Sequence, residues 1–237
     1  MKPTCLSLDL DNTICYLEGG REAFLDIFAA YDIPRKQLEE IYNHLRYGEG
    51  FSPKEFLAAL VAQGFTLDVN SVEKKLTALH RKSLKLYEDA AWLTHKEKTP
   101  SAVPIAIVTA GHPDYQQEKC DLLGIRADHI FVVAPSEGKT APLRELIARY
   151  GTPIIHTDDK LEELDRIRDA GLTEKEVITI ALLRDPKTQQ KTSYTHRVIH
   201  SLAEILTPPL RSLRGSAGGQ RHSLEVRRSN KQRAEAE

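Results

Sequence analysis

The feature that most constrains the fold is an alternation of short apolar runs and helical patterns in the second half of the chain. Four apolar, β-rich runs are each followed by a segment with helical spacing: 103–109 and 113–123, 130–133 and 140–150, 153–157 and 161–170, and 177–182 and 198–206. Short strands that alternate with helices are typical of a parallel sheet with helices on both faces. The sequence therefore predicts an α/β fold with a doubly wound parallel sheet.

A fifth apolar run opens the chain at residues 4–8, and a helical block separates it from the others. Residues 21–88 show four successive helical patterns without a strand between them, which is typical of a small bundle. Capping boxes predict that the third helix begins at Ser52–Glu55 and the fourth at Asn70–Glu73. The fourth pattern extends to Leu86 or Tyr87. The block interrupts the alternation, so we interpret it as an inserted helical domain.

The predicted domain organisation has three parts. Residues 1–18 and 90–207 form the α/β core, and residues 19–89 form the insert. Residues 208–237 carry many basic and few apolar side chains, which predicts a disordered basic tail. Gly19-Gly20 is expected to act as a hinge between the core and the insert.

Composition and charge narrow the expected partners. The formal net charge is -1, with 41% hydrophobic and 28% charged residues, so we expect no general affinity for nucleic acid or for a membrane. The apolar run near the N-terminus is interrupted by Asp9 and Asp11, so we do not expect it to be a signal peptide. The cysteines Cys5, Cys15 and Cys120 lack metal-site spacing, so we expect buried reduced thiols in a cytoplasmic protein.

Polar side chains follow the apolar runs where the strands are expected to end. They are Asp9 and Asp11 after the first strand, Thr109, Lys139, and the pair Asp158-Asp159. Each has a structural alternative, since an Asp or Thr after a strand is commonly a helix cap and a lone lysine commonly lies on the surface. Ligands bind at the carboxyl ends of strands in open α/β sheets. The occurrence of all four features in this order favours a functional site.

The residue types indicate the chemistry. Carboxylates from Asp9, Asp11 and Asp158 repel one another unless a cation lies among them, and all-oxygen ligands suit Mg²⁺. The hydroxyl of Thr109 and the ammonium of Lys139 could hold a phosphate beside that ion. One carboxylate could then attack phosphorus, while the second aspartate of the first pair moves protons.

The ordered motifs resemble those of the haloacid dehalogenase (HAD) superfamily over residues 4–206. The resemblance rests on Asp9-x-Asp11-x-Thr13, on a strand ending in Thr109, on Lys139, and on a strand followed by Asp158-Asp159. The helical block occupies the position of the C1-type cap of that superfamily. The chain departs from the common pattern at Asn12, Ala110, Thr140 and Thr157, but every reactive side chain is present.

The resemblance implies a role for each position. Asp9 is the nucleophile that forms an aspartyl-phosphate, and Asp11 is the general acid/base. The implied phosphate-binding residues are Thr109, Ala110 and Lys139. The implied Mg²⁺ ligands are Asp9, Asp11 through its backbone carbonyl, and Asp158, with Asp159 as an indirect or alternative ligand. Asp11 argues against a true dehalogenase, which needs no acid/base there.

These observations predict a Mg²⁺-dependent phosphomonoester hydrolase of the C1-capped branch. A cap that closes over the aspartates favours a small phosphorylated metabolite as substrate. Two alternatives stay open. One is a sugar-phosphate mutase or another phosphoryl transferase on the same site, and the other is a catalytically silent binding or regulatory protein of this fold. The protein is expected to be a monomer or a homodimer.

Overall fold

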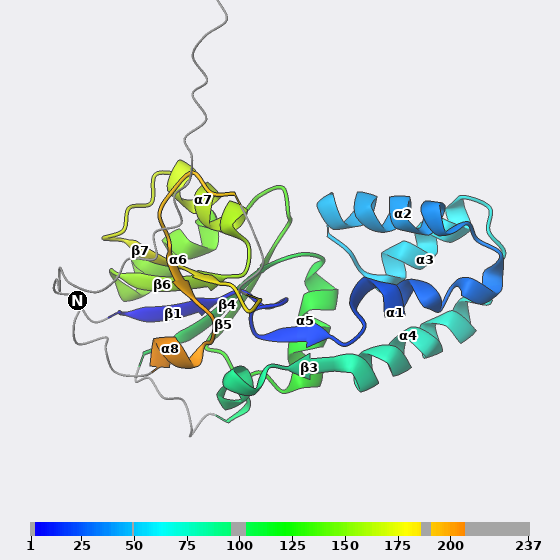
Figure 1. Cartoon of the computed structure of the whole chain (residues 1–237), viewed down its shortest axis with the longest axis horizontal. Coiled ribbons are helices and arrows are strands. Elements are labelled where there is room, and N and C mark those ends of the chain that lie inside the picture. Colours follow the sequence, from blue (N-terminus) through cyan, green and yellow to red (C-terminus); the bar gives the residue numbers. More distant parts are fainter. Residues whose placement is uncertain (1–2, 49, 96–102, 186–190, 207–237) are drawn as a thin grey trace, which may run out of the picture.

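The computed structural model describes residues 3–48, 50–95, 103–185 and 191–206 (Figure 1). Within these ranges one sheet is formed by the strands β1 (Cys5–Leu8), β4 (Ile105–Ala110), β5 (His129–Val133), β6 (Ile154–Asp158), β7 (Val177–Leu182) and β8 (Arg197–Ile199). The strand order is β5-β4-β1-β6-β7-β8, and every neighbouring pair is parallel. The first strand of the chain thus lies at the centre of the sheet.

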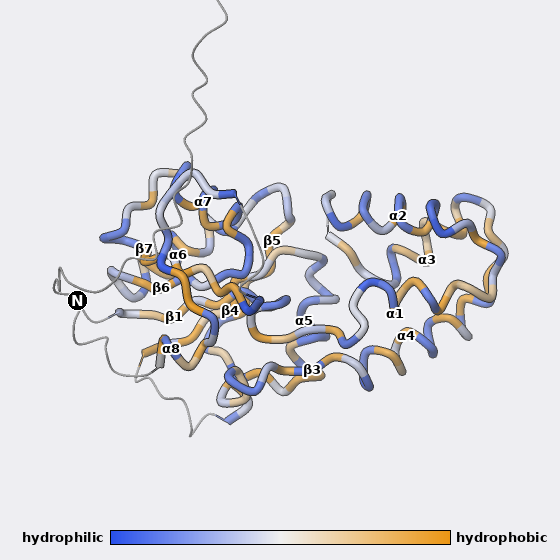
Figure 2. The backbone as a smooth tube through the Cα atoms, in the orientation of Figure 1, coloured by the Kyte–Doolittle hydropathy of each residue, from blue (hydrophilic) through white to orange (hydrophobic). Residues whose placement is uncertain are grey.

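Helices cover both faces of this sheet, because successive strand residues point to opposite sides. On one face, Leu6 and Leu8 pack in a cluster with residues of α5 (Pro113–Leu123), α8 (Ala203–Leu206) and the 3₁₀ helix η2 (Glu88–Thr94). On the other face, Cys5 packs with residues of α6 (Thr140–Tyr150) and α7 (Leu161–Asp169). Figure 2 shows the apolar stretches gathered along the strands. The predicted α/β fold with a doubly wound parallel sheet is confirmed.

The predicted helical insert is also present. It contains α1 (Gly20–Asp26), the 3₁₀ helix η1 (Ala29–Tyr31), α2 (Arg35–Tyr47), α3 (Pro53–Ala62) and α4 (Val69–Ser83). These helices have an apolar cluster of their own, with Phe24, Phe28 and Phe56 in ring contact at its centre. In Figure 1 they lie to one side of the sheet. We call residues 20–83 the helical insert below.

The predicted start of the third helix of the insert is confirmed. Ser52 is the N-cap of α3 and its hydroxyl accepts a hydrogen bond of 3.1 Å from the Glu55 N–H, with Pro53 as the first helical residue. The predicted start of the fourth helix is wrong. Helix α4 begins one residue before Asn70, because the carboxylate of Asp68 caps it by accepting from the Ser71 N–H at 3.1 Å.

The predicted end of the fourth helix is also wrong. Helix α4 ends at Ser83, and the next residues form the strand β3 (Leu84–Leu86). This strand pairs in antiparallel fashion with β2 (Cys15–Leu17), a strand that was not predicted from the sequence and that ends just before the expected hinge at Gly19-Gly20. The segments that enter and leave the insert are therefore joined by backbone hydrogen bonds. Helical periodicity alone does not predict this pairing, because the two strands lie far apart in the sequence.

The C-terminal end of the core differs from the prediction as well. The predicted helix over 198–206 is wrong in its first half, because Arg197–Ile199 form the edge strand β8, parallel to β7. Val198 and Ile199 are β-branched, which favours the strand. Only Ala203–Leu206 are helical.

The predicted division into a core of 1–18 and 90–207 and an insert of 19–89 stays a prediction, as does the hinge at Gly19-Gly20. The predicted tail, 208–237, lies outside the described residues. In the described part of the chain, no helix has both the length and the apolar character needed to cross a membrane.

Candidate active site

The candidate site lies at the carboxyl end of β1, between β4 and β6. In the sheet, β4 lies on one side of β1 and β6 lies on the other. The chain fills the β4 side first and the β6 side afterwards, so the strand order changes direction at β1. Such a position is where open α/β sheets bind ligands. Leu8 pairs with Thr157, and the Asp9 N–H donates to the Thr157 carbonyl oxygen at 2.9 Å. Asp9 and Asp158 consequently leave neighbouring strands at the same edge.

Lys139, the N-cap residue of α6, joins these two aspartates. Its Nζ lies 2.5 Å from Oδ1 of Asp9 and 2.6 Å from Oδ2 of Asp158. The three side chains are nearly inaccessible, with exposed fractions of 2% for Lys139, 8% for Asp9 and 0% for Asp158. Burial alone lowers the pKa of Lys139, but the two carboxylates outweigh it and hold the ammonium charged.

Asp159 adds a third carboxylate to this buried group. Ligand oxygens of Asp9, Asp158 and Asp159 lie within 4.8 Å of one another. Burial, followed by the charges of Asp9 and Asp158, raises the pKa of Asp159 to about 8. A divalent cation would relieve the repulsion among these carboxyl groups, and their oxygens are the ligands that Mg²⁺ prefers. The donor set therefore fits a hard divalent cation.

His156 lies directly behind this group on β6. Its Nε2 is 3.6 Å from Oδ2 of Asp158, and its Nδ1 shares a hydrogen bond of 2.9 Å with the Ser7 hydroxyl. The ring is fully buried. Burial lowers the pKa of His156, which favours the neutral imidazole. Ser7 and His156 thus fill the space between β1 and β6 beneath the carboxylates with polar groups.

Asp11 has a different set of partners. Both of its carboxylate oxygens lie 2.8 Å from Nζ of Lys119, and Nε2 of Gln116 donates to its Oδ2 at 3.1 Å. Gln116 and Lys119 lie on α5, one turn apart. Burial raises the pKa of Asp11, but Lys119 and Gln116 outweigh it and hold this pKa below its ordinary value.

Thr109 and Ala110 end β4, the strand on the other side of β1. Thr109 is buried, and the Ala110 carbonyl oxygen accepts a hydrogen bond of 3.1 Å from Nε2 of Gln116. Gln116 therefore bonds to the end of β4 and to Asp11 at once. The structure thus brings Asp9, Lys139, Asp158 and Asp159 into one group and places Thr109 and Ala110 at the adjoining strand end. Their predicted roles stay predictions.

The helical insert reaches the same edge of the sheet through a close backbone contact. Gly50 has a φ of 105°, and a Cβ at this position would lie 2.3 Å from the Gly111 carbonyl carbon and 2.3 Å from the His112 nitrogen. Beside it, the ring of Phe51 meets that of Tyr115 edge-on, with centroids 5.8 Å apart. The loop after β4 is therefore covered by the insert.

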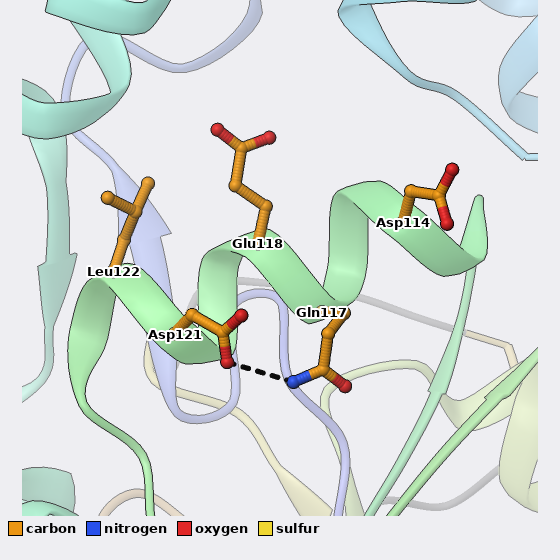
Figure 3. A pocket seen from close by; sticks show the side chains of 5 residues that line it. All are labelled: Asp114, Gln117, Glu118, Asp121 and Leu122. Atoms are coloured by element: carbon orange, nitrogen blue, oxygen red, sulfur yellow. Dashed lines mark hydrogen bonds between the residues drawn. The ribbon is translucent and has the colours of Figure 1, made fainter.

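The outward face of α5 carries a surface pocket that is separate from this site (Figure 3). It is lined by Asp114, Gln117, Glu118, Asp121 and Leu122. In Figure 3 the Gln117 side chain donates to Asp121, at 2.9 Å. The buried residues of α5, which include Gln116 and Lys119, lie on its other face. The pocket lacks the mixed charges of the sheet edge.

No family model matches the sequence, and a search of the curated proteins finds no match. Solved structures do match. The HAD hydrolase YfnB of Bacillus subtilis is 20% identical, with 86% of this chain and 97% of that chain covered and a TM-score of 0.52. The 2-haloacid dehalogenase of Pseudomonas syringae is 18% identical, over 86% and 96%, with a TM-score of 0.58. A HAD family hydrolase of Deinococcus radiodurans is 17% identical, over 86% and 93%, with a TM-score of 0.53. This chain has the HAD fold.

Within this HAD fold, sequence reasoning missed three buried polar residues that support the candidate site: Gln116, Lys119 and His156. A signal for Lys119 was present. It lies four residues after Tyr115 on the inward stripe of α5, where a charged side chain needs a buried partner. No comparable signal marks His156. Strands of a parallel sheet are buried on both faces, so they show no alternation of apolar and polar residues from which the position of a functional side chain could be inferred. Its partner Ser7 becomes its neighbour only through strand pairing.

Proposed function

We propose that this protein is a Mg²⁺-dependent phosphomonoester hydrolase that acts on a small phosphorylated metabolite through an aspartyl-phosphate on Asp9. The observation that carries the proposal is the buried group of Asp9, Lys139 and Asp158, with Asp159 beside it, at the central switch point of the sheet. Asp11 follows two residues later and keeps 43% of its side chain exposed. A buried nucleophile next to a more accessible proton carrier is the arrangement that this reaction needs.

The carboxylates of Asp9, Asp158 and Asp159 are the groups that would hold Mg²⁺, and the resemblance to HAD enzymes adds the backbone carbonyl of Asp11. When bound, the ion supplies positive charge that reduces repulsion between an attacking carboxylate and the phosphate oxygens. Among the proteins that share the fold, the YfnB structure is described as bound to magnesium and the D. radiodurans structure as bound to phosphate and sodium. These descriptions support the choice of ion and ligand.

In the first step, an Oδ atom of Asp9 attacks phosphorus and the bond between phosphorus and the leaving oxygen breaks. Asp11, whose pKa Lys119 and Gln116 lower in the free protein, has to take up a proton before it donates one to that oxygen as the alcohol departs. In the second step, a water oxygen attacks the same phosphorus while Asp11 takes up a proton from this water. The bond between Asp9 and phosphorus then breaks, which regenerates the carboxylate and releases inorganic phosphate. Lys139 holds Asp9 in place and offsets charge throughout.

A phosphoryl transferase, such as a sugar-phosphate mutase, is the closest alternative, since it would use the same first step with a different acceptor. A silent binding protein is the other alternative, and the complete set of reactive side chains weighs against it. We place the activity in the cytoplasm because Cys5, Cys15 and Cys120 are free and buried.

The test is release of inorganic phosphate from a panel of phosphorylated metabolites, with and without Mg²⁺. Asp9→Asn, which keeps the shape of the side chain, is expected to abolish turnover. Asp114→Asn on the outward face of α5 is the matched control and should leave turnover unchanged. Equal activity of Asp9→Asn and the wild type would contradict the mechanism. An isomerised sugar phosphate without free phosphate would indicate the mutase, and halide release from 2-haloacids would indicate a dehalogenase.

A further inference from the structure

We propose that Lys119 and Gln116 of α5 are positioning residues that hold the Asp11 carboxylate in the orientation needed for proton transfer. The inference rests on the proposed function, in which Asp11 carries the proton. It assigns a task to two buried polar side chains that the mechanism above does not use.

The contacts restrain the Asp11 carboxylate from two directions. Nζ of Lys119 lies 2.8 Å from each oxygen, so it sits astride the carboxylate rather than at one end of it. Nε2 of Gln116 lies 3.1 Å from Oδ2 and also 3.1 Å from the Ala110 carbonyl oxygen. The second contact ties the carboxylate to the end of β4, where phosphate binding is predicted. Together the donors restrict the rotation of the Asp11 side chain.

The burial of this ion pair is uneven, which distinguishes it from a surface salt bridge. The Lys119 side chain is 10% exposed, whereas the Asp11 side chain is 43% exposed. Burying an ammonium costs free energy that one carboxylate only partly offsets. An arrangement that buries the lysine and leaves the carboxylate accessible therefore suits a role for Asp11 toward a ligand.

A second layer of contacts holds Lys119 itself. Its Nζ lies 4.4 Å from the ring centroid of Tyr115, within the range of a cation–π interaction. The Tyr115 hydroxyl shares a hydrogen bond of 2.6 Å with Nε2 of His80, on α4 of the helical insert. The ammonium is thus supported from behind by a side chain that the insert also contacts.

The effect of misplacing Asp11 on the rate of ester cleavage should depend on the leaving group. An alkoxide is a poor leaving group and needs a proton from Asp11, whereas 4-nitrophenolate departs without one. A general acid contributes about 100-fold to 10,000-fold when the proton is required. Misplacing Asp11 should therefore slow the cleavage of alkyl phosphates selectively.

The experiment compares the kcat/KM of Lys119→Met for an alkyl phosphate and for 4-nitrophenyl phosphate, because kcat/KM covers the steps up to release of the leaving group. We expect a loss of about 100-fold or more for the alkyl ester and little change for the aryl ester. Lys119→Arg should recover part of the loss. Gln116→Leu should show the same selectivity with a smaller effect, and it serves as the second variant where Lys119→Met does not fold. Glu118→Gln, from the outward face in Figure 3, is the control.

An equal loss on both esters would overturn the inference, because it would indicate a general structural role, and so would no loss on either. Crystal structures of Lys119→Met and of the wild type test the positioning without activity. A different Asp11 rotamer in the variant is expected, and an unchanged one would overturn the inference. If the wild type hydrolyses no phosphate ester, the proposed function fails, while the crystallographic comparison still decides whether Lys119 positions Asp11.

Discussion

Lys139 and Asp158 form a buried ion pair in which Nζ and Oδ2 lie 2.6 Å apart. The lysine is the N-cap of α6, and the aspartate is the last residue of β6, the strand that follows this helix in the chain. The same ammonium also contacts Asp9 of β1. One positive charge thus connects β1, the first strand of the chain, with its neighbour β6.

Lys139→Met should remove the ammonium that contacts both Asp9 and Asp158 while roughly keeping the length of the side chain. Deleting one member of a buried ion pair typically destabilises a protein by about 3–5 kcal/mol. We expect a decrease of this size in the free energy of unfolding, measured with urea, and a loss of the proposed phosphatase activity of about 100-fold or more. Lys36→Met, at a lysine with 88% of its side chain exposed, is the control. A decrease no larger than that of the control would contradict this expectation.

Mg²⁺ should stabilise the folded protein, because an ion bound by Asp9, Asp158 and Asp159 offsets their mutual repulsion. Binding only to the folded state adds about 2.7 kcal/mol when the free ion is at about 100 times its dissociation constant. Thermal unfolding at increasing Mg²⁺ concentrations measures this, and Tm should rise with concentration. In Asp158→Asn the rise should vanish. A Tm that responds equally in both proteins would place the ion elsewhere.

Gly50→Ala should push the helical insert away from the loop after β4. The new Cβ would lie 2.3 Å from backbone atoms of Gly111 and His112, and the positive φ adds a strain of about 1–3 kcal/mol. Gly64→Ala is the matched control, since Gly64 has a φ of 89° but nothing within 4 Å of the Cβ position. We expect Gly50→Ala to lose clearly more unfolding free energy and more activity than the control. Equal losses would show that backbone strain alone matters.

His80 should make the stability of the protein sensitive to acid. Burial, with a smaller contribution from Lys119, lowers the pKa of His80 from 6.5 to about 4. The unfolded chain therefore binds the proton more readily below about pH 6.5, so the stability present at neutral pH is lost as the pH falls toward about 4. Between about pH 7 and pH 5 the loss amounts to about 2 kcal/mol.

Urea unfolding of the wild type and of His80→Gln over this pH range measures the effect. Glutamine can still bond to the Tyr115 hydroxyl but does not titrate, so the difference between the two proteins should shrink as the pH falls. Burial raises the pKa of Asp9 as it does that of Asp159, and both carboxyl groups contribute equally to the two proteins, so their effect cancels in the difference. His44→Gln, at an exposed histidine of the insert, is the control. A difference that is constant with pH would contradict the expectation.

Local sequence patterns predicted most of the fold. Helix α6 was predicted at Thr140–Tyr150 and β7 at Val177–Leu182, and both match the structure, because periodicity and the residues that end each element act over a few positions. The errors arose where a distant partner decided the outcome. Leu84–Leu86 continue a helical pattern, yet they form a strand because β2 offers them hydrogen bonds.

The candidate site divides in the same way. Asp9, Lys139, Asp158 and Asp159 could be found from the sequence, since each follows a predicted strand and parallel strands bring their carboxyl ends to one edge. The partners of Asp11 could not. Lys119 lies 108 positions further along the chain, and its ammonium reaches the carboxylate because α5 packs against the core with that face inward.

The sequence by itself determined the alternation of the first five core strands with helices and the chemistry available at the strand ends, because hydrophobic periodicity and residue type are local properties. Only the tertiary structure decided which charge faces which. It placed Lys139 between Asp9 and Asp158, set Lys119 against Asp11, and brought Gly50 onto the loop after β4. Those pairings depend on how strands and helices pack in three dimensions, since each joins residues that no local pattern relates.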